Sequence, residues 1–289
     1  MSRAHAVEVL DPGPLTLVQD LGRVGHLAIG VGHAGAADRG SYLLGNRLVG
    51  NAVGAPALEV TLGGLRLRAV GDLLVSLTGA PAPADVDGRP VAHAALVEVR
   101  DGQVLTLGRP SAGLRTYVGV RGGFEVPRTL GSASSDTMSG LGPAPLMAGQ
   151  VLAVGSRTES FPVLDAAVVP DPASGTVELD VTPGPRHDWF ADPTALAGSP
   201  WTVSSRSDRR GIRLEGAPLA RRPELRGAEL QSEGMVRGAI QVPPGGQPVL
   251  CLNDHPVTGG YPVIGVVRSA SVDRAAQLQP GQPVRFRWH

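Results

Sequence analysis

The sequence predicts an all-β protein, mostly β with a few short helices. Its 289 residues include 40 glycines and 26 prolines, a content typical of many short strands joined by turns. Apolar residues alternate in stretches such as Leu65, Leu67 and Ala69, as they do in strands with one buried face. Helical periodicity is confined to a few short segments, so we expect barrels or sandwiches of strands.

Composition excludes several classes of function. The 26 basic residues balance 26 acidic ones, so no general attraction to nucleic acid or to an acidic membrane is expected. Every basic residue is an arginine, which excludes a Schiff-base lysine, a P-loop lysine and biotin attachment within this chain. The first residues contain no apolar signal segment, and a cytoplasmic protein is expected. Cys251, the one cysteine, lies in an apolar run and predicts a buried small hydrophobe.

The first segment rich in motifs covers residues 13–51. Residues 15–18 predict a short strand, and Gln19, Asp20 and Arg23 follow its end beside several glycines. These three residues are candidates for substrate binding, because arginine offers a rigid fork to a carboxylate or phosphate. A structural ion pair between Asp20 and Arg23 is the alternative.

A helix is predicted to follow, over residues 38–50. Tyr42 and Leu48 recur near helical spacing, and Gly50 suits the position after the last turn. Asp38 is expected to cap the first turn by accepting hydrogen bonds from its free amides. It is also a candidate catalytic residue, since one carboxylate can have both roles.

Strands and turns are predicted from residue 57 to residue 154. Within them, polar loops at 121–123 and 130–137 are candidates for function, because loops on a rigid sheet commonly carry it. The best linker candidate is 159–175, which contains three prolines. Short echoes between the two halves suggest two related β domains, which we expect at 1–165 and 166–289 with a boundary that could be discontinuous.

The stretch 231–265 contains most of the candidate site. Apolar runs at 235–242 and 248–252 flank a Pro-Pro-Gly-Gly turn, so two joined strands are expected. Glu233 and Asp254 at the strand ends are candidate catalytic carboxylates, and Asp254 either caps a turn or faces Glu233 in a cleft. A glycine pair lets backbone N–H groups approach a ligand. The candidate substrate-binding residues here are Ser232, Thr258, Gly259, Gly260 and Tyr261.

Ordered motifs over nearly the whole chain carry a family resemblance. They occupy residues 18–23, 35–38, 46–51, 207–214, 232–234, 238–248, 254, 258–262 and 276–281. In this order they resemble the KipA family, whose members are also described as a component of 5-oxoprolinase, as allophanate hydrolase subunit 2-like, or as subdomains A and B of a biotin-dependent carboxyltransferase. The resemblance implies two tandem cyclophilin-like β-barrel domains.

The same resemblance implies one subunit of an ATP-dependent 5-oxoprolinase, a hydrolase that opens 5-oxoproline to glutamate. The chain would be inactive alone, and would work with a KipI-like subunit and, as a further candidate partner, a LamB/YcsF-like subunit, with ATP bound together with these partners. Asp254 and Glu233 would position water or accept a proton, and Arg209 and Arg23 would clamp anions, since a phosphorylated lactam develops negative charge. No metal site is expected.

Two alternatives stay open. One is a carboxyltransferase that moves CO2 from carboxybiotin on a partner to a urea-like nitrogen. The other is a regulatory subunit that binds a KipI-like protein without catalysing a reaction. The substrate itself is also left open, because Ala133 stands where the family usually has an arginine, and Gly142-Pro143 stands in place of a glycine pair.

Overall fold

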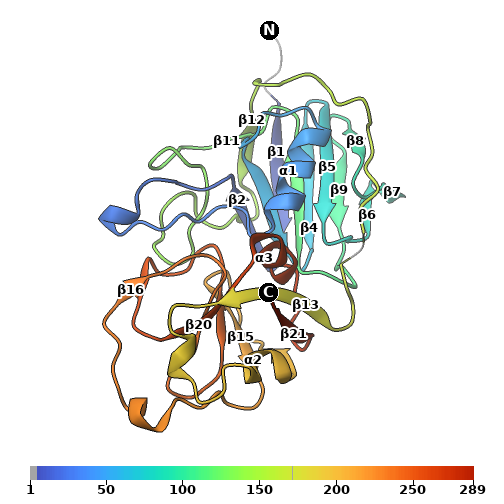
Figure 1. Ribbon diagram of the computed structural model, residues 1–289. Coiled ribbons are helices and arrows are strands. Elements are labelled where there is room, and N and C mark those ends of the chain that lie inside the picture. Colours follow the sequence, from blue (N-terminus) through green and yellow to red (C-terminus); the bar gives the residue numbers. More distant parts are fainter. Residues whose placement is uncertain (1–4, 171) are drawn as a thin grey trace. The chain divides into compact units, whose positions relative to one another are not determined.

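The computed structural model describes residues 5–170 and 172–289, and most of its regular structure is β-strand (Figure 1). The prediction of a mostly β chain is confirmed. The chain packs as two compact units. The first contains the residues up to Arg23, Asp38–Asp136 and Gly140–Pro172, and the second contains Val24–Ala37, Thr137–Ser139 and Ala173–His289. Two segments of the N-terminal half thus belong to the second unit, and the division into folding domains at 165 and 166 stays a prediction.

The strands of the first unit form two antiparallel sheets. In spatial order, the seven-stranded sheet contains β11 (Phe124–Glu125), β12 (Val151–Val154), β1 (Ala6–Pro12), β4 (Leu65–Val70), β9 (Val104–Leu107), β6 (Ala84–Val86) and β7 (Arg89–Pro90). The five-stranded sheet contains β2 (Leu15–Gln19), β3 (Ala57–Thr61), β10 (Arg115–Val120), β5 (Leu73–Gly79) and β8 (Leu96–Val99).

One apolar core joins these two sheets. Val9 and Leu67 of the larger sheet pack in the same cluster as Leu58, Leu77 and Val118 of the smaller one. Along β4 the apolar residues are buried and the arginines between them are exposed, as the alternating sequence predicts. The two sheets therefore pack face to face and bury one side each.

Helix α1 (Arg39–Leu48) packs against β5 and β10 (Figure 1). Asp38 caps it, since its Oδ1 accepts a hydrogen bond from the Ser41 amide at 3.0 Å. Gly50 follows the last turn with a φ of 62°, a conformation that favours glycine. A Cβ at Gly45 would lie only 3.0 Å from Thr78 Oγ1, so this glycine lets the helix approach β5. The predicted helix and its N-cap are confirmed.

The expected linker lies partly on the first unit. Residues 159–167 make backbone hydrogen bonds to this unit, among them those from Glu159 N to Gly50 O and from Leu96 N to Asp165 O, both 2.8 Å. The chain passes to the second unit after Pro172. Residues 1–4 and 171 lie outside the described residues, so the expectations for the first residues and for that part of the linker are not addressed there.

A closed barrel forms the second unit, which confirms the expected barrel for this half. Its strands, in order around the barrel, are β13 (Val177–Pro183), β20 (Val263–Val267), β17 (Ala239–Gln241), β18 (Val249–Cys251), β15 (Gly211–Glu215), β14 (Trp201–Val203) and β21 (Pro283–Trp288). β13 and β21 pair in parallel and the other neighbours pair antiparallel. The barrel encloses a core that includes Leu179, Ile240 and Phe286.

The expected hairpin in this unit is present but shorter than its apolar runs. Ile240 of β17 pairs with Leu250 of β18 across the Pro-Pro-Gly-Gly turn. Cys251 is buried at the end of β18, and burial raises the pKa of its thiol to about 12. A thiol held neutral in this way is inert, as expected for a buried small hydrophobe.

The remaining elements are short. They are β16 (Glu233–Gly234), β19 (Thr258–Gly259), α2 (Ala195–Gly198), α3 (Ser269–Ala275) and the 3₁₀ helices η1 (Leu27–Ile29), η2 (His187–Trp189) and η3 (Pro223–Leu225). Across residues 5–170 and 172–289, no helix has the length and apolar content needed to span a membrane.

Candidate functional site

A two-stranded ribbon joins two of the predicted motifs. Glu233 of β16 pairs with Gly259 of β19, and Gly234 pairs with Thr258. The Ser-Glu-Gly and Thr-Gly-Gly motifs therefore lie side by side, although 25 residues separate Glu233 from Thr258 in the chain. A side chain at Gly259 would collide with the Gln241 amide, so the Gln241 side chain would have to move to admit any other residue there.

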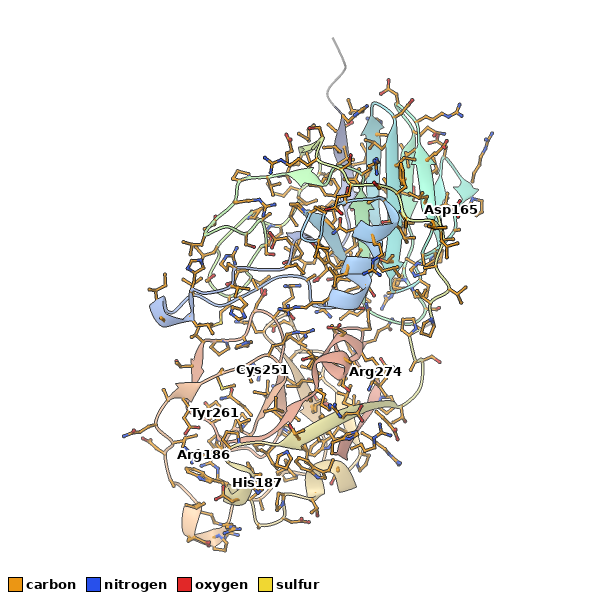
Figure 2. The ribbon with its side chains drawn as sticks, turned by 45° about the horizontal axis from the view of Figure 1, so that its top comes forward. Asp165, Arg186, His187, Cys251, Tyr261 and Arg274 are labelled. Carbon is orange, nitrogen blue, oxygen red and sulfur yellow. The ribbon has the colours of Figure 1, made fainter. Side chains whose placement is uncertain are left out.

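The Glu233 carboxylate is paired at the surface. It accepts hydrogen bonds from Nη2 and Nε of Arg186, the latter at 3.3 Å, and Figure 2 labels this arginine. The two side chains keep 30% and 36% of their exposure, so water screens the pair. The hydrogen bond to Glu233 raises the pKa of Arg186 above its usual range. Glu233 is thus accessible to a ligand, and its catalytic role stays a prediction.

A cavity of about 680 Å³ opens where the chain leaves β19. This volume lies within the range of small-molecule sites in proteins. Two of the predicted substrate-binding residues, Gly260 and Tyr261, contribute to its wall. The rest of the wall comes from residues 218–221, 226–230 and the turn 243–246. The sequence reasoning missed the charged side chains of this wall, which are Arg221, Arg226 and Glu229.

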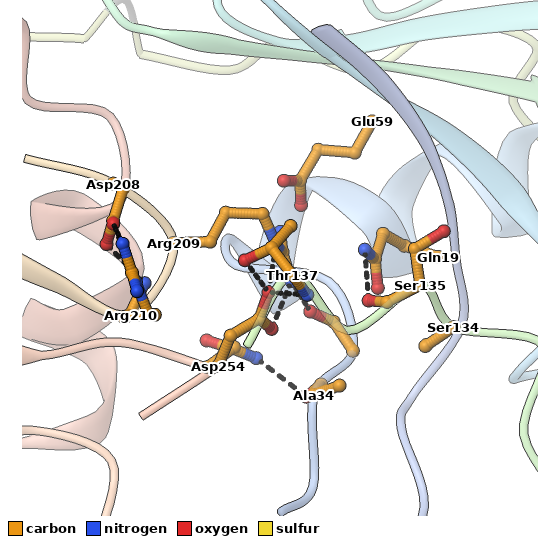
Figure 3. A network of polar contacts seen from close by, with 12 residues as sticks. Gln19, Ala34, Glu59, Ser134, Ser135, Thr137, Asp208, Arg209, Arg210 and Asp254 are labelled. Atoms are coloured by element: carbon orange, nitrogen blue, oxygen red, sulfur yellow. Dashed lines mark hydrogen bonds and ion pairs between the residues drawn. The ribbon is translucent and has the colours of Figure 1, made fainter. Parts of the chain in front are cut away.

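Asp254 lies in the barrel unit but forms a different kind of contact (Figure 3). Arg209 binds both of its oxygens, with Nε to Oδ2 at 2.9 Å and Nη2 to Oδ1 at 3.0 Å. Thr137 donates its backbone N–H and its hydroxyl to Oδ2 at 2.9 and 2.7 Å. The side chains of Asp254 and Arg209 are 0% and 2% exposed. Asp254 therefore neither caps a turn at the surface nor shares a cleft with Glu233, and its catalytic role stays a prediction.

Three side chains of the barrel bind consecutive carbonyl groups of the segment Val24–Ala37. The bonds run from Asn253 Nδ2 to Ala34 O (3.2 Å) and Ala36 O (2.9 Å), from Arg209 Nη2 to Gly35 O (2.7 Å), and from Arg237 Nη2 to Ala37 O (2.7 Å). Arg209 was predicted to clamp a substrate anion. Its bonds to Asp254 and to Gly35 hold this segment on the barrel unit, and its role as an anion clamp stays a prediction.

In the first unit, Asp20 organises the polar loop that follows Arg128. Its carboxylate accepts hydrogen bonds from two backbone amides and two hydroxyls, and pairs with Arg128. The donors are Gly22 N (2.7 Å), Ala133 N (2.7 Å), Ser132 Oγ (2.6 Å), Ser134 Oγ (2.6 Å) and Arg128 Nη1 (3.3 Å). Asp20 is buried, so these bonds replace its water shell. The cation that pairs with it is Arg128 and not Arg23.

Gln19 and Arg23 bind the same loop through its carbonyl groups. Gln19 Nε2 donates to Ser135 O at 3.0 Å, and Arg23 Nη2 donates to Ser134 O at 2.5 Å. In this cluster, three buried side-chain atoms find no hydrogen-bond partner among the described residues, namely Gln19 Oε1, Arg23 Nη1 and Ser135 Oγ. Buried groups of this kind retain capacity to bind a polar molecule. A substrate-binding role for Gln19, Asp20 and Arg23 stays a prediction.

The backbone of Asp38 takes part in a buried chain of hydrogen bonds. Its N–H donates to Tyr117 Oη at 2.8 Å, and the Tyr117 hydroxyl donates to Glu59 Oε2 at 2.8 Å. Burial, with the nearby carboxylate of Glu59, raises the pKa of Tyr117 well above its usual value. This tyrosine therefore stays protonated and links β3 to the start of α1. A catalytic role for Asp38 stays a prediction beside its confirmed cap.

Comparison with known proteins identifies the family. Residues 29–288 match the carboxyltransferase domain, subdomain A and B. The chain belongs to this family. The family resemblance inferred from the sequence motifs is thereby confirmed.

Relatives of this carboxyltransferase-family chain differ greatly in length. It is 38% identical to a 5-oxoprolinase subunit of Escherichia coli over 97% of the chain and 90% of that protein. It is 33% identical to the urea amidolyase of Saccharomyces cerevisiae over 97% of the chain but only 16% of that protein. The crystal structure of the urea amidolyase of Kluyveromyces lactis matches with a TM-score of 0.90 and 31% identity, covering 99% of this chain and 19% of that one.

One departure from the family pattern has a structural explanation. Ala133, at the position where the sequence resemblance implies an arginine, is fully buried and packs in the core of the first unit. An arginine at this position would bury its charge in the apolar core, which is energetically costly. Arg128, five positions earlier in this carboxyltransferase-family chain, places a cation beside the same loop through its bond to Asp20.

Proposed function

We propose that the chain is a subunit of an ATP-dependent 5-oxoprolinase complex that opens 5-oxoproline to glutamate. The 38% identity to the 5-oxoprolinase subunit of Escherichia coli carries this proposal, because it extends over 97% of the chain and 90% of that relative. The two proteins are thus comparable over almost their whole lengths. The urea amidolyases, in contrast, contain this chain's fold as a small part of a much larger protein.

The chemistry of the reaction favours a division of its steps among several subunits. A lactam carbonyl is unreactive, and phosphorylation of its oxygen makes the carbonyl carbon a better electrophile. The negative charge of the phosphate must then be stabilised by the site. The cavity wall of this chain has two arginines and one glutamate as its charged side chains. One net positive charge does not fit a triphosphate, so we assign ATP to the partners, a KipI-like subunit and the candidate LamB/YcsF-like subunit.

The purified chain is expected to form no glutamate from 5-oxoproline and ATP by itself. Combined with its KipI-like and LamB/YcsF-like partners, it should give ATP-dependent glutamate formation, and omission of this chain should abolish it. Glutamate and ADP released by each combination of subunits are the quantities to measure. Full turnover by the single chain would contradict the proposal that it acts as one subunit.

A carboxyltransferase role is the second candidate. It is favoured by the family match over residues 29–288 and by the TM-score of 0.90 to a urea amidolyase. Because the chain contains no lysine, biotin would be attached to a partner in this case. Turnover of urea that requires bicarbonate and is blocked by avidin would establish this role. If the complex is instead a 5-oxoprolinase, avidin leaves its activity unchanged. Binding of a KipI-like protein without either reaction would favour a regulatory subunit.

A further inference from the structure

The wall of the cavity in the second unit includes several apolar residues. Leu219, Pro243 and Pro244 are among them, and Tyr261, which also lines the cavity, has 46% of its surface exposed. Apolar and aromatic walls with a few polar groups are typical of sites for small molecules. A compact ligand with a saturated ring or a short aliphatic chain would pack against these apolar residues.

The cavity wall also carries two charged side chains without partners among the described residues. Arg226 and Glu229 are exposed, and neither side chain forms an ion pair or hydrogen bond within the described chain. Asp208 and Arg210 of the same unit, in contrast, are exposed and pair with each other at 2.6 Å. Arg226 presents the planar fork that matches a carboxylate, and Glu229 can accept a hydrogen bond from an N–H group.

Arg221 fixes the loop that presents these two residues. Its Nη1 donates to Ala228 O at 2.9 Å, and its guanidinium carbon lies 5.8 Å from the ring centroid of Trp189. Its Nε is buried and finds no hydrogen-bond partner among the described residues. The arginine thus holds the segment between Arg226 and Glu229 and adds a second positive charge to the wall, which favours an anion over a cation.

We infer that this cavity binds a small amino-acid-like molecule through one carboxylate and one N–H group. Arg226 binds the carboxylate, Glu229 accepts the N–H, and Tyr261 with the two prolines covers the aliphatic part. 5-Oxoproline and glutamate both present this combination, so the choice of ligand rests on the proposed function. The location of the binding site is independent of that function, because it follows from the charges and shape of the cavity wall.

Calorimetric titration of the purified chain tests the chemical class. 5-Oxoproline or glutamate is expected to bind. 2-Pyrrolidinone, which lacks the carboxylate, and cyclopentanecarboxylate, which lacks the N–H, should each bind on the order of tenfold more weakly or worse, because each loses one charge-assisted hydrogen bond. Equal affinity for 5-oxoproline and both analogues, or no binding of any of the four compounds, would overturn the inference.

Matched variants test the location. Arg226→Gln and Glu229→Gln should each weaken binding of the preferred ligand on the order of tenfold. Arg222→Gln and Glu224→Gln change exposed residues of the same loop that do not contribute to the cavity wall, and should leave affinity unchanged. If the control variants lost as much affinity for the ligand as the cavity variants, the inference would be overturned. Full turnover of 5-oxoproline by a complex that carries Arg226→Gln would also overturn the inference, but it would leave the proposed function intact. Binding that depends on Arg226, without turnover of 5-oxoproline by the assembled complex, would support the binding site and contradict the proposed function.

Discussion

Replacing Asp254 by asparagine is expected to destabilise the barrel unit by about 3–5 kcal/mol, the cost of breaking a buried ion pair from one side. Arg209, whose side chain is 2% exposed, would lose its ionised partner and both charge-assisted bonds to this carboxylate. The new amide would also point its N–H groups at an arginine that can only donate. Thr137 would lose its charged acceptor in the same step. Urea unfolding monitored by tryptophan fluorescence measures the change, since Trp189, Trp201 and Trp288 all lie in this unit.

The matched control is Asp208→Asn. Asp208 also pairs with an arginine, Arg210, but the side chains of this pair are 42% and 58% exposed. Exposed pairs contribute about 0–1 kcal/mol, so this variant should unfold close to the parent protein. Turnover of the assembled complex is measured on both variants. A variant Asp254→Asn that keeps the parent stability and loses about a hundredfold or more in turnover would mean that this carboxylate is catalytic.

Local features were predictable from the sequence because short-range physics determines them. The Asp38 cap depends on an amide three residues away. The alternation along β4 and the burial of Cys251 in an apolar run require only the hydrophobic pattern. The turn at 243–246 follows from two prolines and two glycines. In each case the residues that decide the structure are neighbours in the chain.

Partners of the buried charges were not predictable in the same way. Asp254 lies 45 residues from Arg209, and Asp20 lies 112 residues from Ser132. The nearest arginine in the sequence, Arg23, was the natural candidate for Asp20, yet the fold brings Arg128 to it instead. No local pattern distinguishes an arginine that will bind a carboxylate in the core from one that will face water.

The cavity wall illustrates the same limit for function. Gly260 and Tyr261 were found because they belong to a glycine-rich motif at a strand end. Arg226 and Glu229 sit in an irregular loop whose sequence contains no motif, and only its packing against the turn 243–246 gives them a shared cavity. Sequence motifs therefore identify the part of a site that is encoded locally, and miss the part that tertiary packing assembles.

Removing the Asp20 side chain is expected to loosen the loop 128–135 and to destabilise the first unit by about 2–6 kcal/mol. Asp20→Ala leaves the backbone amides of Gly22 and Ala133 without their acceptor. Each buried unsatisfied donor costs about 1–3 kcal/mol, and backbone amides cannot turn to another partner as the two serine hydroxyls can.

A graded series makes this expectation specific. Asp20→Asn keeps Oδ1, which accepts from Gly22, Ser132 and Ser134, but places an amide N–H group opposite the Ala133 N–H. Because one backbone donor is left unsatisfied, Asp20→Asn should lower the free energy of unfolding by about 1–3 kcal/mol. Its stability should therefore lie between that of the parent and that of Asp20→Ala. Asp11→Ala is the control, because Asp11 is exposed and accepts a single amide at 2.9 Å, and should cost about 0.5 kcal/mol or less. Hydrogen exchange of the Ala133 amide should accelerate in the order Asp20→Asn, Asp20→Ala. Unchanged protection of that amide in Asp20→Ala would mean that the serines and Arg128, rather than the carboxylate, hold this loop in place.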